Sequence, residues 1–569
     1  MKKYPEIIAA LAASAAGGDP AEYLALIAAP PKPEMGDYTL PCFSLSKKLK
    51  KDPKKIAAEL ADRVMLEGTP FAAAEAAGPY LNFRLDGVEL AREVLTSIHE
   101  EGDKFGNSGA GAGRTVIIDY SSPNIAKPFH IGHLRSTVIG AALYRIYGAL
   151  GYRPVGINHL GDWGTQFGMV MAAFKEHGDE AALASDPIGY SLKLYVEFNQ
   201  RCERDEAARE PAKLWFKRLE DGDPEARALW EKFRGLSLIK FEKIYRRLGV
   251  GFDHYTGESF YNDKMDAALD RVRRAGVLSR SDDGAEMIKL DEFGLPPFIL
   301  KKSDGATLYA TREIAAVLYR FETFRPEKIL YVVGTPQELH FRQLQQSLKL
   351  MGLDFADRIV HVKFGHVQGM STRRGEVVLL EDVLDEAKQK AREKVEENVA
   401  AGKLDSSADR DALAEAVGIG ALIANDLKHR RERDIVFDWD QAMQFDGETG
   451  PYLQYAYARI MGIMRKAGSS ESDASADFAE LNEPETRALL RALADFPEAV
   501  EKAAADNEPS YITTYLFELS KAFNVFYIVH RVLGAGDRKE PARLGLVAAS
   551  GQVIKNGLSL LGIPVLERM

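Results

Sequence analysis

One segment, residues 115–150, constrains the fold of this chain more than any other. It opens with a β-branched run at 115–118, breaks at a turn that contains Pro123, and continues as a helical pattern over 134–150. A strand that turns directly into a helix leaves the first backbone N–H groups of that helix unpaired. These groups and the helix dipole together favour a phosphate. The segment therefore predicts one strand of an α/β sheet with an anion site at its end.

Two histidines lie at the start of the predicted helix. His130 and His133 are three residues apart, so both side chains can face one pocket. Imidazole groups in that place can stabilise the charge that builds on a phosphorus atom while pyrophosphate leaves. Gly132 has no side chain and leaves a flat face for a base such as adenine. A lone histidine pair is most often structural, but with the turn and Lys127 it predicts a nucleotide-activating site.

The other half of this site is expected where a second strand of the same sheet ends. His366 and a loop at 369–376, which contains glycine, serine and two arginines, follow a later strand-like run. Ligands of open α/β sheets bind in the crevice outside the carboxyl ends of the strands. Arginine side chains in such a loop are suited to closing over a polyphosphate.

Short β-branched runs and helical patterns alternate through the middle of the chain. The runs lie at 116–120, 155–159, 328–333 and 358–364. This alternation is typical of a parallel, doubly wound sheet. A charged, mostly helical stretch at about 175–297 is expected to be an insertion, and beyond about residue 381 the pattern is almost wholly helical.

The predicted fold class is therefore a multidomain α/β protein with a Rossmann-like core. The predicted domains are an N-terminal α/β module at 1–113, the core at 114–385 with its helical insertion, a helical connector at 386–448, and an all-helical bundle at 449–569.

Charge and cysteine content exclude several classes of protein. The formal net charge is −10, so no global basic field attracts nucleic acid, and a polyanion has to meet local patches. One such patch is 46–55, which holds six lysines. Alone, such a run is most often a solvated helix face. Cys42 and Cys202 lie far apart and outside any zinc spacing, which excludes a disulfide framework and a structural metal and favours a reducing compartment.

Neither export nor a membrane span is expected. The apolar run at 7–16 is mostly alanine and follows Pro5 and Glu6, unlike a secretory signal. No run reaches the roughly 18 apolar residues that cross a bilayer. We expect a cytoplasmic protein, and nothing in the sequence demands more than a monomer.

Polar residues at strand ends and helix starts predict a small-molecule pocket. They are Asp119, Asn124, Tyr309, Glu313 and Gln337. Two acids and two amides around one tyrosine suit a cationic ligand with several donors, such as a guanidinium group. Most of these residues, taken singly, are more often surface or capping groups. Asp119 is the exception, because a carboxylate on an apolar strand needs a partner.

The order of short motifs resembles that of one family, the arginyl-tRNA synthetases of class I. The motifs are SSPNIAKPFHIGH at 121–133, GDWGTQFG at 161–168, SDGATLYATRE at 303–313, YVVG at 331–334 followed by Gln337 and His340, TGPYLQY at 449–455, VIKNGL at 553–558 and ERM at 567–569. They cover nearly the whole chain in order, and several are specific to the arginine enzymes.

The resemblance implies a two-step reaction. ATP, with Mg²⁺, and L-arginine form arginyl-adenylate and pyrophosphate, and the arginyl group then passes to the 3′ end of tRNA(Arg). The implied catalytic residues are His130, His133 and Lys127. The implied ATP-binding residues are Gly132, His130, His133, His366, Met370 and Arg373. The implied arginine-binding residues are Asp119, Ser122, Asn124, Tyr309, Glu313 and Gln337. No metal ligand is implied, and Glu313 stands where the family often has an aspartate.

The resemblance also implies how tRNA is bound. The N-terminal module is similar to the family's domain for the tRNA elbow (the D-loop), the connector at 386–448 to its stem-contact region, and the terminal bundle to its anticodon-binding domain. The apolar stripe over 512–530 is expected to be mainly bundle core. The residues expected to contact tRNA are Lys47, Lys48, Lys51, Asn82, Tyr455, Arg459, Tyr527 and Met569.

The chain departs from the class I pattern in its closing loop. Gly369 and Thr372 stand where the usual Lys-Met-Ser-Lys-Ser loop has its two lysines. Many arginine enzymes share this loss. We expect Lys127 to supply the missing cation, with Arg373 second. The family also tends to need bound tRNA before it activates arginine, and we expect the same here.

Two other functions share some of these sequence features. One is another class I synthetase or a small nucleotidyltransferase with the same histidine motif, but the arginine-type motifs and the large helical C-terminus argue against both. The other is a non-catalytic paralogue that binds tRNA as a regulator. Only the altered closing loop favours it, since His130 and His133 are both present.

Overall fold

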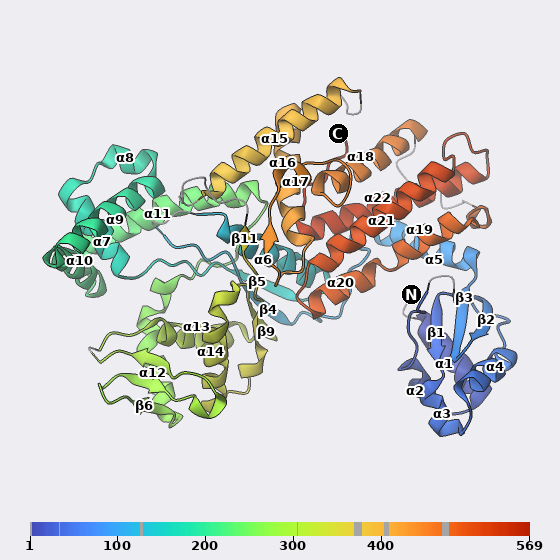
Figure 1. The fold of residues 1–569 in the computed structure, drawn as a ribbon, viewed down its shortest axis with the longest axis horizontal. Helices are drawn as coiled ribbons and strands as arrows, with labels where there is room; N and C mark the ends of the chain where they lie inside the picture. The colour runs from blue at the N-terminus through green and yellow to red at the C-terminus, as the bar shows by residue number, and fades with distance from the viewer. Residues whose placement is uncertain are drawn as a thin grey trace. The chain divides into compact units, whose positions relative to one another are not determined.

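The computed structural model describes residues 3–32, 35–125, 129–303, 305–368, 378–402, 409–468 and 477–569 (Figure 1). Its contacts divide the chain into two compact units. The first comprises Met1–Phe105, Ile460–Phe496 and Glu518–Val553, and the second comprises Gly106–Arg459, Pro497–Phe517 and Ile554–Met569.

A four-stranded parallel sheet forms the centre of the second unit, which confirms the predicted doubly wound core. Its strands are β4 (Thr115–Asp119), β5 (Arg153–Ile157), β9 (Lys328–Tyr331) and β10 (Ile359–His361), in the order β10-β9-β4-β5. All of β4 is buried, as expected for a strand with parallel neighbours on both sides. The direction of winding reverses between β4 and β9, so the ligand crevice is expected at their carboxyl ends.

Three helices that begin at or near predicted site residues pack around this sheet. They are α6 (Gly132–Ala149), α13 (Tyr309–Phe324) and α14 (Glu338–Leu350). Ile314 and Phe321 of α13 pack with Ile117 and Ile329 of the sheet in one apolar core. Helix α6 approaches β4 closely because residue 140 is glycine, and a Cβ there would lie 2.3 Å from Cβ of Tyr120.

The insertion is helical at first and then becomes a small sheet. Its helices are α7 (Thr165–His177), α8 (Glu180–Ser185), α9 (Pro187–Arg204), α10 (Glu210–Glu220) and α11 (Pro224–Arg247), which gather at the left of Figure 1. After α12 (Met265–Arg274), β6 (Leu278–Arg280), β7 (Glu286–Ile288) and β8 (Phe298–Lys301) pair antiparallel. The prediction of a mostly helical stretch is wrong for this sheet, because strands of three or four residues are too short to show a period of two.

Two long helices follow the sheet, as the helical pattern predicted. Helix α15 (Leu380–Ala400) packs along α16 (Arg410–Leu427), and a Cβ at Gly418 would lie 2.8 Å from the carbonyl group of Ala387. A two-residue strand, β12 (Ile435–Val436), then pairs in parallel with β11 (Val367–Gln368). The helices that follow are α17 (Trp439–Ala442), α18 (Gly450–Ala467), α19 (Pro484–Ala494), α20 (Phe496–Ala505), α21 (Ser510–Val529) and α22 (Lys539–Leu561).

The first unit contains the predicted N-terminal α/β module. An antiparallel sheet joins β1 (Tyr38–Pro41), β3 (Tyr80–Leu85) and β2 (Phe71–Ala77) in that order. The helices are α1 (Lys3–Ala16), α2 (Pro20–Leu24), α3 (Phe43–Leu49), α4 (Pro53–Arg63) and α5 (Gly87–Glu101). Asp86 caps α5 by accepting from the backbone of Val88 at 2.9 Å. Arg487 of α19 donates to Asp37 at 2.6 Å within this unit.

One helix of the described residues, α22, is long and apolar enough to cross a membrane, although the sequence analysis expected no such run. Its most apolar window has a mean hydropathy of 1.2, and 67% of that window is buried within the protein. Buried core helices of soluble proteins pass the same test.

Candidate functional site

The turn after β4 has an unusual backbone. Ser121 and Ser122 both have left-handed conformations, with φ of 70° and 47°. Residues with side chains avoid this region unless their surroundings hold them there, and such strain is common at functional sites. The Ser121 backbone N–H donates to Oγ of Ser136 at 2.9 Å, and its Oγ lies 2.8 Å from the hydroxyl of Tyr245 on α11. The turn is therefore fixed from both α6 and the insertion.

The two predicted histidines lie together, as expected. The rings of His130 and His133 are 4.0 Å apart between centroids. Burial lowers the pKa of His130, and burial together with the nearby His130 lowers the pKa of His133 to about 3. Both imidazoles are therefore neutral near neutral pH.

The first backbone donors of α6 pair within the turn that precedes the helix and with residue 378. Its N-cap residue, Ile131, supplies no side-chain hydrogen bond. Gly132 donates its N–H to Nδ1 of His130 at 3.1 Å, and a Cβ at residue 132 would lie only 2.8 Å from that ring. Glycine is needed here to make room for the histidine, besides leaving a flat face for a base.

Three of the predicted nucleotide-site residues lie outside the described residues. They are Lys127, Met370 and Arg373. His366 is exposed, and its backbone N–H donates to Asp434 at 2.7 Å.

Asp119 has a partner that sequence reasoning missed. Its Oδ2 lies 2.7 Å from Nη2 of Arg320, whose side chain is 0% exposed, and its Oδ1 accepts from Oγ of Ser122 at 2.9 Å. The expectation that a carboxylate on this strand needs a partner is correct, but the partner belongs to the protein. The sequence contained a signal, because Arg320 is a charged residue on the apolar, core-facing side of α13.

Within the described part of the chain, Glu313 keeps one carboxylate oxygen without a hydrogen-bond partner. It is buried, and its Oε1 accepts no hydrogen bond from any described residue. Burial alone raises the pKa of this carboxyl, but the net shift of the pKa is downward, and the positive charge of the neighbouring Arg320 contributes to it. Burial also lowers the pKa of His159 and of His340, so both imidazoles are neutral.

Asp119, Glu313, Arg320, His159 and His340 form one cluster, and its fixed charges sum to one negative charge. Asp119 and Glu313 each contribute one negative charge and Arg320 one positive charge, while the histidines contribute none. A buried net charge is costly unless a ligand of opposite charge balances it. The pocket therefore fits a ligand group with a single positive charge.

The other predicted pocket residues border the cluster. Tyr309 begins α13, is 44% exposed, and its ring centroid lies 4.9 Å from that of His340. Asn124 and Gln337 are exposed. Asn124 also forms a backbone bridge with Gly161. These three residues can contact the polar end of a ligand whose cation reaches Glu313.

A cavity of about 790 Å³ lies between the insertion and the start of α13. Trp163, Phe216, Trp230 and Arg312 are among its lining residues. The centroids of the Trp163 and Trp230 rings are 6.0 Å apart. Sequence reasoning missed Trp230, although tryptophan occurs only four times in the chain.

The predicted RNA contacts are accessible at some positions and buried at others. Tyr455, Arg459 and Tyr527 are partly exposed, and Lys47 is exposed. Lys48 and Lys51 are exposed but form ion pairs with Glu22 and Glu59.

Two of these residues have buried side chains. Asn82 is 3% exposed on β3, and Met569 is 7% exposed. Residues 81–83 of β3 are all buried, so both faces of the strand are covered at Asn82. A terminal methionine gains by burying its apolar side chain.

Comparisons with known proteins match all three parts of the chain. The family described as tRNA synthetases class I (R), catalytic domain, matches residues 95–439. The DALR anticodon binding domain matches residues 453–569, and the arginyl tRNA synthetase N terminal domain matches residues 3–85.

Similar whole proteins agree with these matches. The arginine–tRNA ligase of Clostridium perfringens is 49% identical over 549 residues, 96% of each chain. The solved arginyl-tRNA synthetase of Thermus thermophilus superposes over 100% of both chains with a TM-score of 0.82 at 27% identity. That of Plasmodium falciparum covers 95% of this chain and 94% of its own, with a TM-score of 0.79 at 25% identity.

Proposed function

The chain belongs to the arginyl-tRNA synthetases of class I, and on that premise we propose which residues carry each part of the reaction. The enzyme is an arginine–tRNA ligase. It forms arginyl-adenylate and pyrophosphate from ATP and L-arginine, and then transfers the arginyl group to the 3′ end of tRNA(Arg) with release of AMP.

We propose that Glu313 binds the guanidinium group of the substrate. The observation that carries this assignment is its buried Oε1, which lacks a donor among the described residues, in a cluster with one net negative charge. A guanidinium fork can pair with such a carboxylate through two hydrogen bonds, whereas a lysine ammonium cannot match that geometry. Asp119 and Ser122 support the pocket, with Asp119 oriented by Arg320. Asn124, Tyr309 and Gln337 contact the remaining polar groups of arginine.

We propose that ATP lies against the start of α6. The helix dipole is positive at this end, and the neutral His130 and His133 can donate hydrogen bonds as negative charge develops. Lys127 supplies the cation that the closing loop lacks. Gly132, His366, Met370 and Arg373 complete the nucleotide site, and Mg²⁺ enters with the ATP phosphates as part of the substrate.

We propose that tRNA binds along all parts of the chain. Residues 1–113 contact the elbow, 386–448 the stem, and 449–569 the anticodon, where the partly exposed Tyr455, Arg459 and Tyr527 can stack on or bond to bases. Lys47, Lys48 and Lys51 contact backbone phosphates. The enzyme acts as a monomer in the cytoplasm, and the free, buried thiols of Cys42 and Cys202 are consistent with a reducing compartment.

Aminoacylation with arginine and with lysine, using wild type and Glu313→Gln, tests the pocket assignment. Loss of the buried charge partner is expected to raise KM for arginine by about 100-fold, and Glu313→Asp should retain part of the activity. The matched control is Glu286→Gln. Glu286 lies on β7, is buried, and pairs with Arg273 and Arg280. An unchanged KM in Glu313→Gln contradicts the assignment. A wild-type protein that binds tRNA but forms no arginyl-tRNA would favour the non-catalytic alternative.

A further inference from the structure

The histidine motif is held between two helices that come from distant parts of the chain. On one side, the ring of Phe129 lies 5.1 Å from Phe241 and 5.5 Å from Tyr245, both on α11 of the insertion. On the other side, the start of α15 pairs with the motif through the backbone. Leu380 N–H donates to the Phe129 carbonyl at 2.8 Å, and Ile131 N–H donates to the Val378 carbonyl at 3.2 Å. The position of His130 therefore depends on where α11 and α15 lie relative to each other.

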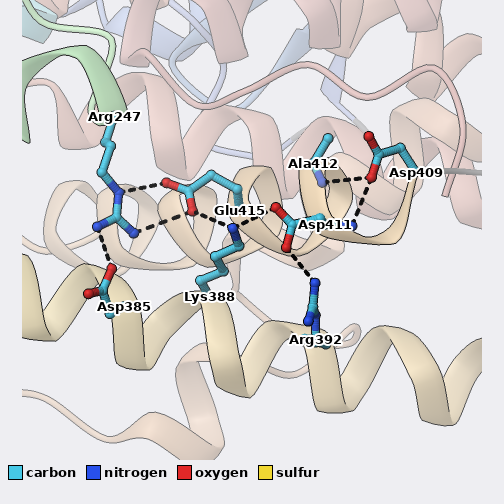
Figure 2. Close-up of polar contacts among 8 residues, drawn as sticks. All are labelled: Arg247, Asp385, Lys388, Arg392, Asp409, Asp411, Ala412 and Glu415. Carbon is cyan, nitrogen blue, oxygen red and sulfur yellow. Dashed lines mark hydrogen bonds and ion pairs between the residues drawn. The ribbon is translucent and has the colours of Figure 1, made fainter. Parts of the chain in front are cut away.

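Arg247, the last residue of α11, fixes that relation with charges. Its Nε and Nη2 donate to the two carboxylate oxygens of Glu415 on α16 at 2.8 and 3.3 Å. Its Nη1 donates to Asp385 on α15 at 2.6 Å. Figure 2 shows this guanidinium between the two carboxylates. One arginine thus links three helices: the last helix of the insertion and both helices that follow the closing loop.

Neighbouring charges extend this link along α15 and α16. Lys388 pairs with Asp411 at 2.7 Å and lies 3.8 Å from Glu415, and Arg392 also pairs with Asp411 (Figure 2). Lys243, one turn before Arg247, pairs with Glu381 on the first turn of α15 at 2.6 Å. Single exposed ion pairs contribute little, but the Arg247 side chain is only 16% exposed and forks between two partners.

Helix α16 also contacts the histidine-bearing helix α6. Asp426, near the end of α16, forms a buried ion pair with Arg135 of α6 at 3.2 Å. Arg135 donates in addition to the Gly365 carbonyl at 2.8 Å, close before the closing loop. The motif, α15, α16 and α6 therefore form a closed ring of contacts, and Arg247 ties α11 to that ring.

We propose that Arg247 is a positioning residue for adenylate formation. Through Asp385 and Glu415 it holds α15 against α11, so that residues 378–380 keep His130 and His133 in place for ATP. Misplacement of reacting groups by about 1 Å can reduce a rate by about 100-fold, so a modest shift of α15 is enough to matter. This inference rests on the proposed role of His130 and His133 in binding ATP.

Steady-state pyrophosphate exchange with tRNA(Arg) present, on wild type, Arg247→Ala and Arg247→Lys, tests the proposal. For Arg247→Ala we expect kcat to fall by about 10-fold while KM for arginine stays within about twofold, because the Glu313 pocket is untouched. Arg247→Lys keeps the charge but loses the fork and should give an intermediate kcat. The double variant Arg247→Glu with Glu415→Arg reverses the charges of the pair. Its kcat should be higher than that of Arg247→Glu alone.

Arg201→Ala is the matched control. Arg201 on α9 forks onto Glu176 of α7 at 2.5 and 3.1 Å, so it joins helices of the insertion without reaching α15. Its exchange kinetics should equal those of wild type. Three outcomes would each overturn the proposal. The first is a wild-type kcat in Arg247→Ala, and the second is an equal loss of kcat in Arg201→Ala. The third is a loss of kcat that thermal unfolding explains by a smaller folded fraction.

Two further variants keep the outcome decisive. If Arg247→Ala does not fold, Glu415→Gln, which preserves shape, takes its place with the same expected loss of kcat. His130→Ala separates this inference from the proposed function on which it rests. Normal exchange in His130→Ala refutes the ATP-site assignment, whereas an inactive His130→Ala together with a normal Arg247→Ala refutes only the positioning role.

Discussion

At the scale of single residues, the site depends on which charges the protein itself neutralises. Arg320 pairs with Asp119, and Glu313 retains an unpaired oxygen. Asp119 and Glu313 were both predicted from their positions in the sequence. Their different roles follow from Arg320, which lies seven positions after Glu313 on the same face of α13. Arg320 pairs with Asp119, which lies on a strand about 200 residues earlier in the chain.

The neutral histidine pair makes folding stability depend on pH. The pKa of His133 is lowered to about 3, whereas an unfolded histidine titrates near about 6.5. Between these values the unfolded chain binds a proton that the folded protein excludes, so stability falls as the pH is lowered below about 6.5, by up to about 1.4 kcal/mol per pH unit. Apparent Tm measured from pH 7 to pH 5 should fall more steeply for wild type than for His133→Asn. Parallel curves would show that His133 does not titrate in this way.

At the scale of elements, close packing of α6 on β4 sets the place of the histidines. Gly140→Ala puts a Cβ 2.3 Å from Tyr120, and overpacking of this kind costs about 1–3 kcal/mol. Gly148→Ala on the same helix is the control, because its Cβ would meet nothing nearer than Pro154 at 3.8 Å. The control should be neutral or slightly stabilising, since alanine favours helix over glycine. Thermal and urea unfolding should separate the two variants, and equal midpoints would contradict this account of the packing.

Elements with a strong periodic pattern were predictable, and short elements were not. Strand β4 and helix α6 were expected from an apolar run and a helical pattern, and both are present within a few residues of their predicted bounds. Strands β6 and β7 have three residues each, and they form only because they pair with each other and with β8. Such strands gain their stability from partners in the sheet, which a local pattern does not contain.

At the scale of the whole molecule, we expect arginine activation to depend on tRNA. Helices α15 and α16 begin the proposed stem-contact region, and the start of α15 also pairs with the histidine motif. RNA bound along these helices can therefore act on the ATP site. Pyrophosphate exchange should be negligible without tRNA(Arg) and should appear when it is added. Robust exchange in its absence would contradict this expectation, with non-cognate tRNA as the control.

The sequence by itself determined the fold class, the family, and the position of the histidine motif, because local periodicity and contiguous motifs are enough to predict these features. It also identified both carboxylates of the proposed arginine pocket. Only the tertiary structure decided that Arg320 neutralises Asp119, that Asn82 and Met569 are buried, and that Arg247 joins three helices. The physical reason is the same in each case. Burial and ion pairing depend on distances between residues far apart in the chain, and those distances are set by packing rather than by any local pattern.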